Sequence, residues 1–451
     1  MRDLLVVAIV LAAAPVCILV PYFGVLMSSW IAYFNPHRFA YSFATTFPVA
    51  QVIVIPTMIG AVFTKDRNHK FITRETALLL LFWVWMAITL TNAYFEPVFF
   101  DHLVDAKLRM IEISKIMITT FLAILLVTSK QKLRYLLIVT AFCFGVLAVK
   151  GTIFGILTGG QFRVWGPPNS FVADNNDFGL ALNMTIPMLF FLARDEQNRK
   201  LKILFRATFI CGAVAVLLTY SRGALLGLCA VLAVTAFRSR YKGLSLAMIV
   251  LAAFLVVTFA PGKWMGRMSD LFGGNLDESA QERITSWQFA WTFTKHYPIT
   301  GGSFETFTPA LFSMYSPRDP RTWLAGHTSS GPHSIYFQVM AEQGFVGLAI
   351  FLTLLLSCLF SARRLRKRVK PFPELSWVTT YSYIVDTSVI GYMVSGAFLG
   401  RAYFDLYLQL VAILILLKLI ARKELRSLQR RSAVIEVPAQ EVEPELQPAL
   451  P

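Results

Sequence analysis

Charged residues are scarce in this sequence, and so are the motifs of soluble enzymes. Only 15% of the 451 residues are charged, whereas 56% are hydrophobic. The chain has no Asp-x-Asp pair of the kind that holds a metal–nucleotide diphosphate, no HExxH, no Walker A loop and no GxSxG. These absences argue against soluble nucleotide chemistry and against a dedicated metal site, so we expect neither a metal nor a cofactor.

Cysteines are also few, and their positions exclude a disulfide framework. The long polar stretch 261–332 contains none. No CxxC spacing indicates a metal or redox site. All five lie inside hydrophobic runs: Cys17, Cys143, Cys211, Cys229 and Cys358.

What the chain has in abundance is long hydrophobic runs, and its mean hydropathy is +0.59. Runs long enough to cross a bilayer core of ~30 Å as a helix recur along nearly the whole length. We therefore predict an all-α polytopic membrane protein. Twelve transmembrane helices are expected, at 4–20, 46–63, 77–94, 112–128, 135–157, 178–193, 204–219, 223–237, 244–260, 334–360, 377–398 and 402–420.

Two apolar segments near the start of the chain have an ambiguous relation to the membrane. The short apolar piece 22–33 ends in Asn35-Pro36-His37 and has no room to cross separately, so we expect it to be re-entrant or interfacial. The first run, 4–20, has a cleaved signal peptide as its competing interpretation. The positive charge before it is only Arg2, which favours an uncleaved first helix.

The distribution of basic residues predicts the orientation. Six connections, at 65–74, 130–134, 194–206, 238–242, 363–370 and 422–431, hold 26 of the 42 basic residues. The positive-inside rule assigns them to the cytoplasm. The net charge of +16 then needs no nucleic-acid partner. The run 363–370 is better interpreted as an anchor on anionic lipid than as a nucleic-acid patch.

The predicted organisation has two parts. Residues 1–430 form a transmembrane domain that includes a large periplasmic loop, 261–333. Residues 431–451 are rich in Pro and Glu and are expected to be a disordered cytoplasmic tail. We expect the membrane bundle and its outer loops to carry the function, in contact with the lipid bilayer.

Several arginines fall on the face that should hold few of them, which suggests an anionic ligand. Arg222 has the most favourable context, because in Thr219-Tyr220-Ser221-Arg222-Gly223 the serine can cap the following helix. A guanidinium beside a helix N-terminus suits a phosphate, although a snorkelling interfacial arginine is the alternative. The full set is Arg163, Arg222, Arg267, Arg283, Arg318, Arg321 and Arg401.

A histidine marks the end of the long loop. The sequence Gly331-Pro332-His333-Ser334 precedes a membrane helix, whose N-terminal dipole disfavours the protonated imidazole. A neutral imidazole is what a general base requires. The alternative is an ordinary loop histidine, like His296 and His327 in the same loop. Glu342 follows two and a half turns into that helix, and an intramembrane carboxylate is costly unless it is paired or functional.

The outer loops contain further candidates. Segment 277–296 is predicted to be a helix with one aromatic face that contains Trp287 and Trp291. Arg283 lies one helical step from Trp287, and either pairs with Glu278 or Glu282 or makes a second phosphate contact. The polar segments 161–168 and 173–177 suit a hydroxyl-rich ligand and suit a plain loop equally well.

Taken together, these stretches resemble the O-antigen ligase and polymerase superfamily over most of the chain. The matching motifs are Arg163-x-x-Gly166 with Asp174-Asn175-Asn176, Thr219-x-Ser221-Arg222-Gly223, Arg283-x-x-x-Trp287, Gly301-Gly302-Ser303-Phe304, and His333-Ser334-x-Tyr336 with Glu342-x-Gly344. The opening, with Pro21-Tyr22-x-Gly24 and Asn35-Pro36-His37-Arg38, looks like the exosortase-associated O-glycosylation ligase branch. One departure is that the usual His-Asn pair of the family reads His333-Ser334 here.

The resemblance implies a GT-C-type glycosyltransferase of the bacterial inner membrane, an O-antigen ligase. Its donor would be a glycan on undecaprenyl diphosphate, and its acceptor a sugar hydroxyl of lipid A–core at the periplasmic face, without an essential metal. His333 would deprotonate the acceptor and Arg222 would hold the diphosphate, the two catalytic roles. Substrate-binding roles would fall to Arg283, Arg163, Tyr336, Glu342 and Asn175.

Other functions stay open at this stage. Within the superfamily, the acceptor could be another lipid-linked glycan, which would make the protein a polymerase, or a protein Ser or Thr. A transporter of anionic lipid is the alternative from a different class. It would favour internal repeats and charges near mid-membrane, whereas this sequence has no clear repeat and its unexpected charges gather at one face.

Overall fold

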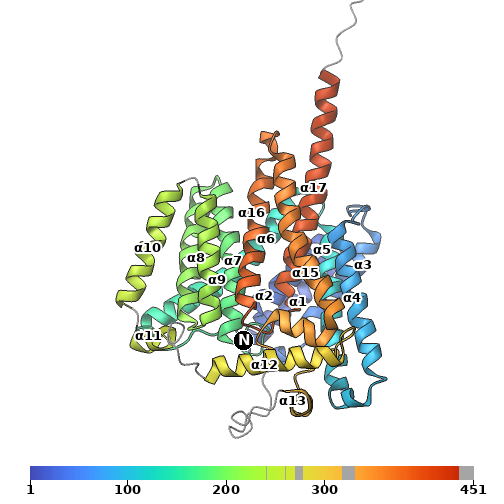
Figure 1. Cartoon of the computed structure of the whole chain (residues 1–451). Coiled ribbons are helices and arrows are strands. Elements are labelled where there is room, and N and C mark those ends of the chain that lie inside the picture. The colour runs from blue at the N-terminus through green and yellow to red at the C-terminus, as the bar shows by residue number, and fades with distance from the viewer. Residues whose placement is uncertain (240, 260, 270–277, 317–330, 436–451) are drawn as a thin grey trace, which may run out of the picture.

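The protein is a bundle of helices in the computed structural model, which describes residues 1–239, 241–259, 261–269, 278–316 and 331–435 (Figure 1). Over these ranges the chain forms helices and no strands. The α-helices are α1 Arg2–Leu19, α2 Pro21–Phe34, α3 Val49–Phe63, α4 Arg74–Ala93, α5 Leu103–Leu126, α6 Lys130–Leu157, α7 Asn175–Asp195, α8 Arg199–Leu218, α9 Arg222–Arg238, α10 Lys242–Phe259, α11 Gly262–Ser269, α12 Glu278–His296, α13 Pro309–Tyr315, α15 Ile335–Val369, α16 Ser376–Gly396 and α17 Asp405–Ile435.

The chain is an all-helical membrane protein. Within the described residues, six helices are long and apolar enough to cross a membrane: α1, α4, α6, α7, α8 and α15. Each of the twelve predicted spans falls on a helix. Lipid offers no hydrogen-bond partner to the backbone, so a helix is the state that satisfies its polar groups within one segment.

Polar side chains start many of these helices where the sequence changes from a connection to an apolar run. Thr73 accepts a hydrogen bond from the Thr76 N–H at 3.2 Å, Ser129 from Lys132 at 3.3 Å, and Asn198 from Lys200 at 2.9 Å. Such caps satisfy amide groups that have no partner within the helix. The cap residues therefore determine where α4, α6 and α8 begin.

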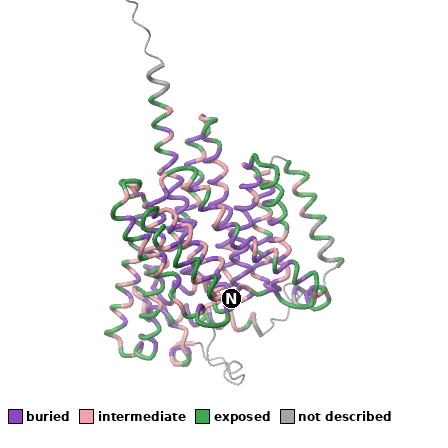
Figure 2. The backbone as a smooth tube through the Cα atoms, turned by 180° about the vertical axis from the view of Figure 1, so that it is seen from behind, coloured by how far each residue is buried: buried purple, intermediate pink, exposed green. Residues whose placement is uncertain are grey.

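The centre of the bundle is formed by α7 and α16, which pack against each other and against α9, and α16 also packs against α15. Buried residues concentrate in this region (Figure 2). By contrast, α10 lies at one edge against α9 and exposes large apolar side chains, among them Leu244, Met248 and Phe254. An exposed apolar edge is what a helix in contact with lipid presents.

The six basic connections meet at one end of the bundle, called the basic end below. The Lys132 ammonium lies 2.6 Å from Asp66, and Arg134 pairs with Glu196. The Arg366 guanidinium lies 2.7 Å from Asp386, which also pairs with Arg238. Further bonds, from Arg194 to the carbonyl of Arg238 and from Trp377 to Glu424, link the remaining connections. The prediction that these connections share a face is confirmed by their contacts.

The opposite end is called the α12 end, because α12 lies across it (Figure 1). The N-terminus lies at this end, where the Asp3 carboxylate accepts a hydrogen bond from the Ser42 N–H at 2.9 Å. In contrast, α17 ends at the basic end.

The interpretation of 22–33 as a re-entrant or interfacial piece is wrong. The Tyr22 hydroxyl donates to the Lys132 carbonyl at the basic end, with an O···O distance of 2.7 Å, so α2 starts there. Further along, the Tyr33 ring lies 5.5 Å from that of Phe144, halfway along α6. Helix α2 spans only about 21 Å at the usual helical rise, and residues 35–48 complete the path to the start of α3. The segment thus connects the two ends of the bundle.

The helix that follows His333 is not continuous. Gly344 has φ 69° and ψ −175°, so α15 consists of a short part, 335–343, and a long apolar part, 345–369. The short part packs along α12. The prediction of one membrane span from 334 is therefore corrected: the break puts Glu342 beside the α12 end instead of deep in the bundle.

At the C-terminal end, α17 continues to Ile435, past the position where we expected the tail to begin. The remaining residues of the predicted tail, 436–451, lie outside the described residues.

Candidate active site

Arg222 lies at the link between α8 and α9, at the α12 end of the bundle. Tyr220 adopts a left-handed backbone conformation with φ 58°, which is uncommon for a bulky residue. Ser221 then caps α9, its hydroxyl accepting from the Ala224 N–H at 3.2 Å. Arg222 is the first residue of the helix and is only 8% exposed. A buried guanidinium thus lies beside the partial positive charge of a helix N-terminus.

The start of α7 is tied to this link. Asp174 caps α7, its carboxylate accepting from the Asn176 N–H at 2.8 Å. The next residue, Asn175, is buried and donates its side-chain N–H to the Thr219 carbonyl at 2.7 Å. Asn175, predicted to bind substrate, therefore holds two helix ends together next to Arg222.

The connection between α16 and α17 brings Arg222 and His333 to one place. A Cβ on Gly223 would lie 3.1 Å from the Cβ of Phe398. On the same connection, a Cβ on Gly400 would lie 2.4 Å from the Pro332 ring, so only glycine fits there without a shift. The residues next to Arg222 and next to His333 thus pack against a single short segment.

His333 precedes α15 in a left-handed conformation, with φ 44°. Ser334 caps the helix, its hydroxyl accepting from the Tyr336 N–H at 3.3 Å. Burial lowers the pKa of His333 below its usual value, the Arg283 charge lowers it further, and Asp174 opposes this more weakly. The imidazole is therefore neutral near pH 7, and both Arg283 and Asp174 lie in its surroundings.

Arg283 lies on helix α12, which packs along the short part of α15. The helix predicted at 277–296 is confirmed as α12 over Glu278–His296, and residue 277 lies outside the described residues. The Trp287 ring stacks on Phe337 with centroids 5.3 Å apart, and its centroid lies 6.3 Å from that of Phe398. The face that contains Arg283 and Trp287 therefore packs against α15 and against the α16–α17 connection.

The glycines of two sequence motifs meet beneath this site. The Phe345 N–H donates to the Pro298 carbonyl at 2.8 Å, and the Gly302 N–H donates to the Ala341 carbonyl at 3.0 Å. A Cβ on Gly344 would lie 2.1 Å from the Ile299 carbonyl oxygen. The turn after α12 is thus docked into the break in α15, and the break needs glycine both for its positive φ and for this close approach.

Two predicted substrate-binding residues make contacts within the protein. The Tyr336 hydroxyl donates to the Met393 carbonyl at 3.0 Å, across to α16. Glu342 is buried and accepts from the Gln338 amide at 3.4 Å. Gln338 in turn accepts from the Ala402 N–H at 3.0 Å, which ties α15 to the α16–α17 connection. These contacts support the framework around His333, and a role of either residue toward substrate stays a prediction.

The other arginines predicted at this face have different environments. Arg163 is exposed and lies beside Tyr220, whose pKa is raised by burial and lowered less strongly by the Arg163 charge. Arg401 pairs with the buried Asp177, so its charge is balanced within the protein. The side chain of Arg267, and Arg318, Arg321 and His327, lie outside the described residues. Of the loop histidines, His296 is exposed, with its Nδ1 2.9 Å from the Thr292 carbonyl.

The sequence did not reveal every residue that shapes this end. Asp177 lies in the polar segment 173–177 that the sequence singled out, but its ion pair with Arg401, 224 residues away in sequence, could not be inferred from it. No sequence motif singled out His102. It is buried, and its Nε2 lies 3.0 Å from the carbonyl oxygen of Gly302, two hundred residues away in sequence. The described residues contain no cluster of three or more His, Cys, Asp or Glu side chains placed to hold a metal.

Two known protein families match parts of this chain. Residues 1–197 match a family of unknown function (DUF5935), and residues 207–352 match the family described as O-antigen ligase. No curated protein matches the chain. The second match contains Arg222, Arg283 and His333, the residues that the α16–α17 connection and α12 gather at one end of the bundle. This match supports the O-antigen ligase and polymerase superfamily through the domain at residues 207–352, which carries the candidate site.

Proposed function

We propose that this protein is an O-antigen ligase, which transfers a glycan from undecaprenyl diphosphate to a sugar hydroxyl of lipid A–core. One observation carries the proposal: a buried arginine at a capped helix N-terminus and a neutral histidine both lie at the α16–α17 connection. The first suits the diphosphate of a donor, and the second suits the hydroxyl of an acceptor.

The donor diphosphate would bind at Arg222 and Arg283. The amide groups of the first turn of α9 and the Arg222 guanidinium present hydrogen-bond donors and positive charge together. Arg283 adds a second guanidinium from α12. Neutralising a diphosphate makes it a good leaving group, so the reaction needs no strong general acid.

His333 would act as the general base. It takes the proton of the acceptor hydroxyl while that oxygen attacks C1 of the donor sugar. The bond between C1 and the diphosphate oxygen breaks on the opposite side, which inverts the configuration at C1 and releases undecaprenyl diphosphate. The proton on His333 then passes to water. This displacement would need no metal.

The electrostatics of the site would couple the two substrates. In the free enzyme, the Arg283 charge contributes to the low pKa of His333. A diphosphate bound at Arg283 would offset that charge, so the pKa of His333 would rise and the base would become stronger once the donor is present. Asp174 would stabilise the imidazolium that forms during the transfer, because its charge acts on His333 in that direction.

Orientation supports a periplasmic reaction at the bacterial inner membrane. The positive-inside rule predicts that the basic end faces the cytoplasm. The α12 end, with Arg222 and His333, would then face the periplasm, and α17 would end in the cytoplasm.

The decisive experiment is a reconstitution with purified protein and undecaprenyl-diphosphate glycan. Three acceptors are offered separately: lipid A–core, a second lipid-linked glycan, and a Ser/Thr-containing protein. Mass spectrometry then shows which one gains sugar, with and without EDTA. We expect lipid A–core to be glycosylated and EDTA to have no effect. Transfer only to the second lipid-linked glycan would indicate a polymerase, and transfer only to protein would indicate a protein O-oligosaccharyltransferase.

Movement of the glycolipid across the bilayer without covalent transfer would indicate the transporter instead. Proteoliposomes that hold labelled donor on one side distinguish this outcome, because a ligase leaves the label on that side unless an acceptor is present.

A further inference from the structure

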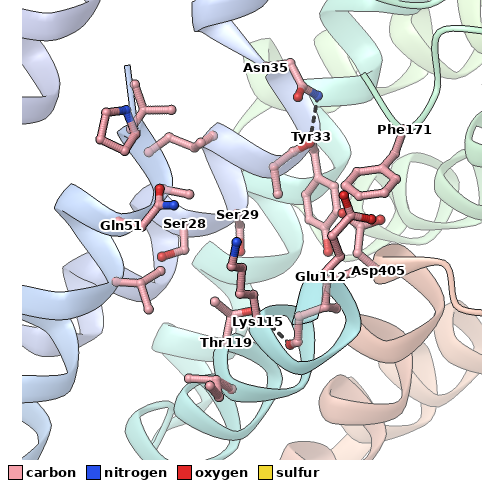
Figure 3. A pocket seen from close by; sticks show the side chains of 18 of the residues that line it. Ser28, Ser29, Tyr33, Asn35, Gln51, Glu112, Lys115, Thr119, Phe171 and Asp405 are labelled. Atoms are coloured by element: carbon pink, nitrogen blue, oxygen red, sulfur yellow. Dashed lines mark hydrogen bonds between the residues drawn. The ribbon is translucent and has the colours of Figure 1, made fainter. Parts of the chain in front are cut away.

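A second site lies in the part of the chain that matches the family of unknown function. A cavity of about 760 Å³ lies between α2, α3 and α5, closed at one end by residues 169–171 and by the start of α17 (Figure 3). Its volume is within the usual range for small-molecule and lipid-like ligands. None of Arg222, Arg283 and His333 lines it.

One wall of this cavity is apolar. Val25 and Ile31 of α2 and Val54 and Met58 of α3 contribute to it. On α3, Ile55 is 55% exposed and Met58 is 43% exposed, although both lie in a helix of the bundle. Exposed apolar side chains in a helix that faces the cavity are suited to a hydrocarbon chain.

The opposite wall carries basic groups at membrane depth. Lys115 is an exposed residue of α5, and its side chain extends into the cavity toward Ser28 and Ser29 of α2 (Figure 3). At the usual helical rise it lies roughly 18 Å from the start of α5 at Leu103 and roughly 16 Å from its end at Leu126. A lysine at such a depth is costly unless a partner offsets its charge.

The protein provides Lys115 with no such partner among the described residues. Two carboxylates line the cavity, and neither forms an ion pair with Lys115: Glu112 pairs with Arg109 at 2.9 Å, and Asp405 accepts a hydrogen bond from the Leu406 N–H at 2.7 Å. Arg38, near the α12 end of the cavity, also has no acidic partner among the described residues. No ion pair among the described residues offsets the positive charges of Lys115 and Arg38. A negatively charged group of a ligand could therefore bind between them.

The cavity and the candidate active site lie on either side of the ion pair between Arg401 and Asp177. Arg401 lines the cavity and pairs with Asp177, three residues after Asp174, which acts on His333. Arg222 lies with α8 and α9, whereas α3 and α5 lie on the opposite side of the bundle, with α2 in the middle (Figure 1). A ligand in the cavity would approach His333 from the side away from the proposed diphosphate site.

We propose that this cavity binds the acceptor of the transfer, a membrane lipid that carries phosphate on its headgroup. Its acyl chain would lie along the apolar wall of α2 and α3. Its phosphate would bind Lys115 and Arg38, and the sugars beyond it would extend past residues 169–171 toward His333. The naming of the ligand as acceptor rests on the proposed function, whereas the site for a phosphorylated lipid does not.

Binding measurements test the site without any transfer reaction. Purified protein is titrated with bis-phosphorylated lipid A and, separately, with undecaprenyl diphosphate, and bound lipid is counted by native mass spectrometry. The matched pair is Lys115→Gln in the cavity and Lys107→Gln, two turns away on the same helix, exposed and outside the cavity lining. A second variant, Ser28→Trp, fills the cavity and leaves its charges in place.

We expect Lys115→Gln to weaken lipid A binding roughly tenfold, because one charge-assisted contact to phosphate is lost. Ser28→Trp should abolish it, Lys107→Gln should leave it unchanged, and undecaprenyl diphosphate should bind all three variants equally. Dephosphorylated lipid A should bind wild type and Lys115→Gln alike. Equal lipid A binding by Lys115→Gln and Lys107→Gln, or a loss of undecaprenyl diphosphate in its place, would overturn the proposal. If wild type binds lipid A but glycosylates nothing, the cavity stands and the proposed function fails.

Discussion

Two helices at the α12 end begin in the same way and present different chemistry. Both α9 and α15 follow a left-handed residue, Tyr220 or His333, and both are capped by a serine directly after it. At α9, the side chain that we propose to be functional is Arg222, the first residue after the cap. At α15, it is His333, the residue before the cap.

This difference of two positions decides what each helix terminus does. A guanidinium cannot lose its proton, so Arg222 adds a permanent charge to the positive end of α9, which suits a phosphate. An imidazole can stay neutral, and burial together with Arg283 keeps His333 in that form. Under the proposed function, the same capped turn would therefore provide an anion site in one helix and a general base in the other.

The largest effect should come from removing the base. His333→Ala should lower the rate of glycan transfer by roughly 10²–10⁴-fold, the usual contribution of a positioned general base. The measurement is transfer by the reconstituted protein at saturating donor. His296→Ala, which changes an exposed histidine on α12, is the control and should keep full activity. Full activity in His333→Ala would remove it from the mechanism.

A smaller loss is expected at the other helix. Arg222→Ala should lower kcat/KM for the donor by roughly 10²–10³-fold, because a preorganised charge contact is lost. Arg222→Lys should recover part of it, since a lysine keeps the charge and loses the forked hydrogen bonds. Arg199→Ala, an exposed arginine at the basic end, is the matched control. A donor dependence equal to wild type in Arg222→Ala would show that the diphosphate binds elsewhere.

The Arg283 charge lowers the pKa of His333, so removal of this charge should change the pH profile. In Arg283→Gln the pKa of His333 should rise, because one cause of its lowering is gone. The acidic limb of kcat/KM, which reports the free enzyme, should then move to higher pH, so activity falls more at pH 6 than at pH 8. Arg283→Lys should keep the wild-type limb. An unshifted limb in Arg283→Gln would separate Arg283 from the base.

The caps themselves should matter least. Ser221→Ala and Ser334→Ala should each lower stability by about 1 kcal/mol, the usual cost of losing a serine N-cap, measured as a shift in the thermal unfolding midpoint in detergent. Ser334→Asn restores the family's usual His-Asn pair and an equally good cap. It should match wild type in stability and stay within a few fold in transfer rate. A large loss of transfer in Ser334→Asn would indicate that the serine has a role beyond capping.

Much of the fold was predictable because local signals are strong in a membrane protein. The apolar runs, the basic connections and the helix 277–296 depend on composition and on spacing within one segment. The α2 segment was interpreted wrongly because its length is ambiguous: 14 residues are too few to cross alone, and only the contacts of Tyr22 with Lys132 and of Tyr33 with Phe144 show where it runs.

The candidate site was predictable in part for the same reason. Ser221 and Ser334 are recognisable caps, so the environments of Arg222 and His333 could be inferred from their neighbours in sequence. The partner of Arg401 could not, because Asp177 lies on another helix. Nor could the break at Gly344, since a glycine inside an apolar run is also compatible with a continuous helix.

The sequence by itself determined that this chain is a helical membrane protein, which end of the bundle is basic, and which residues stand at two capped helix starts. These properties depend on hydropathy, charge and cap chemistry, which act over a few residues. Only the tertiary structure decided that the two helix starts meet against the α16–α17 connection, and that α2, α3 and α5 enclose a cavity with an exposed lysine. Such arrangements depend on contacts between segments far apart in the chain, and a single sequence does not encode those distances in any local pattern.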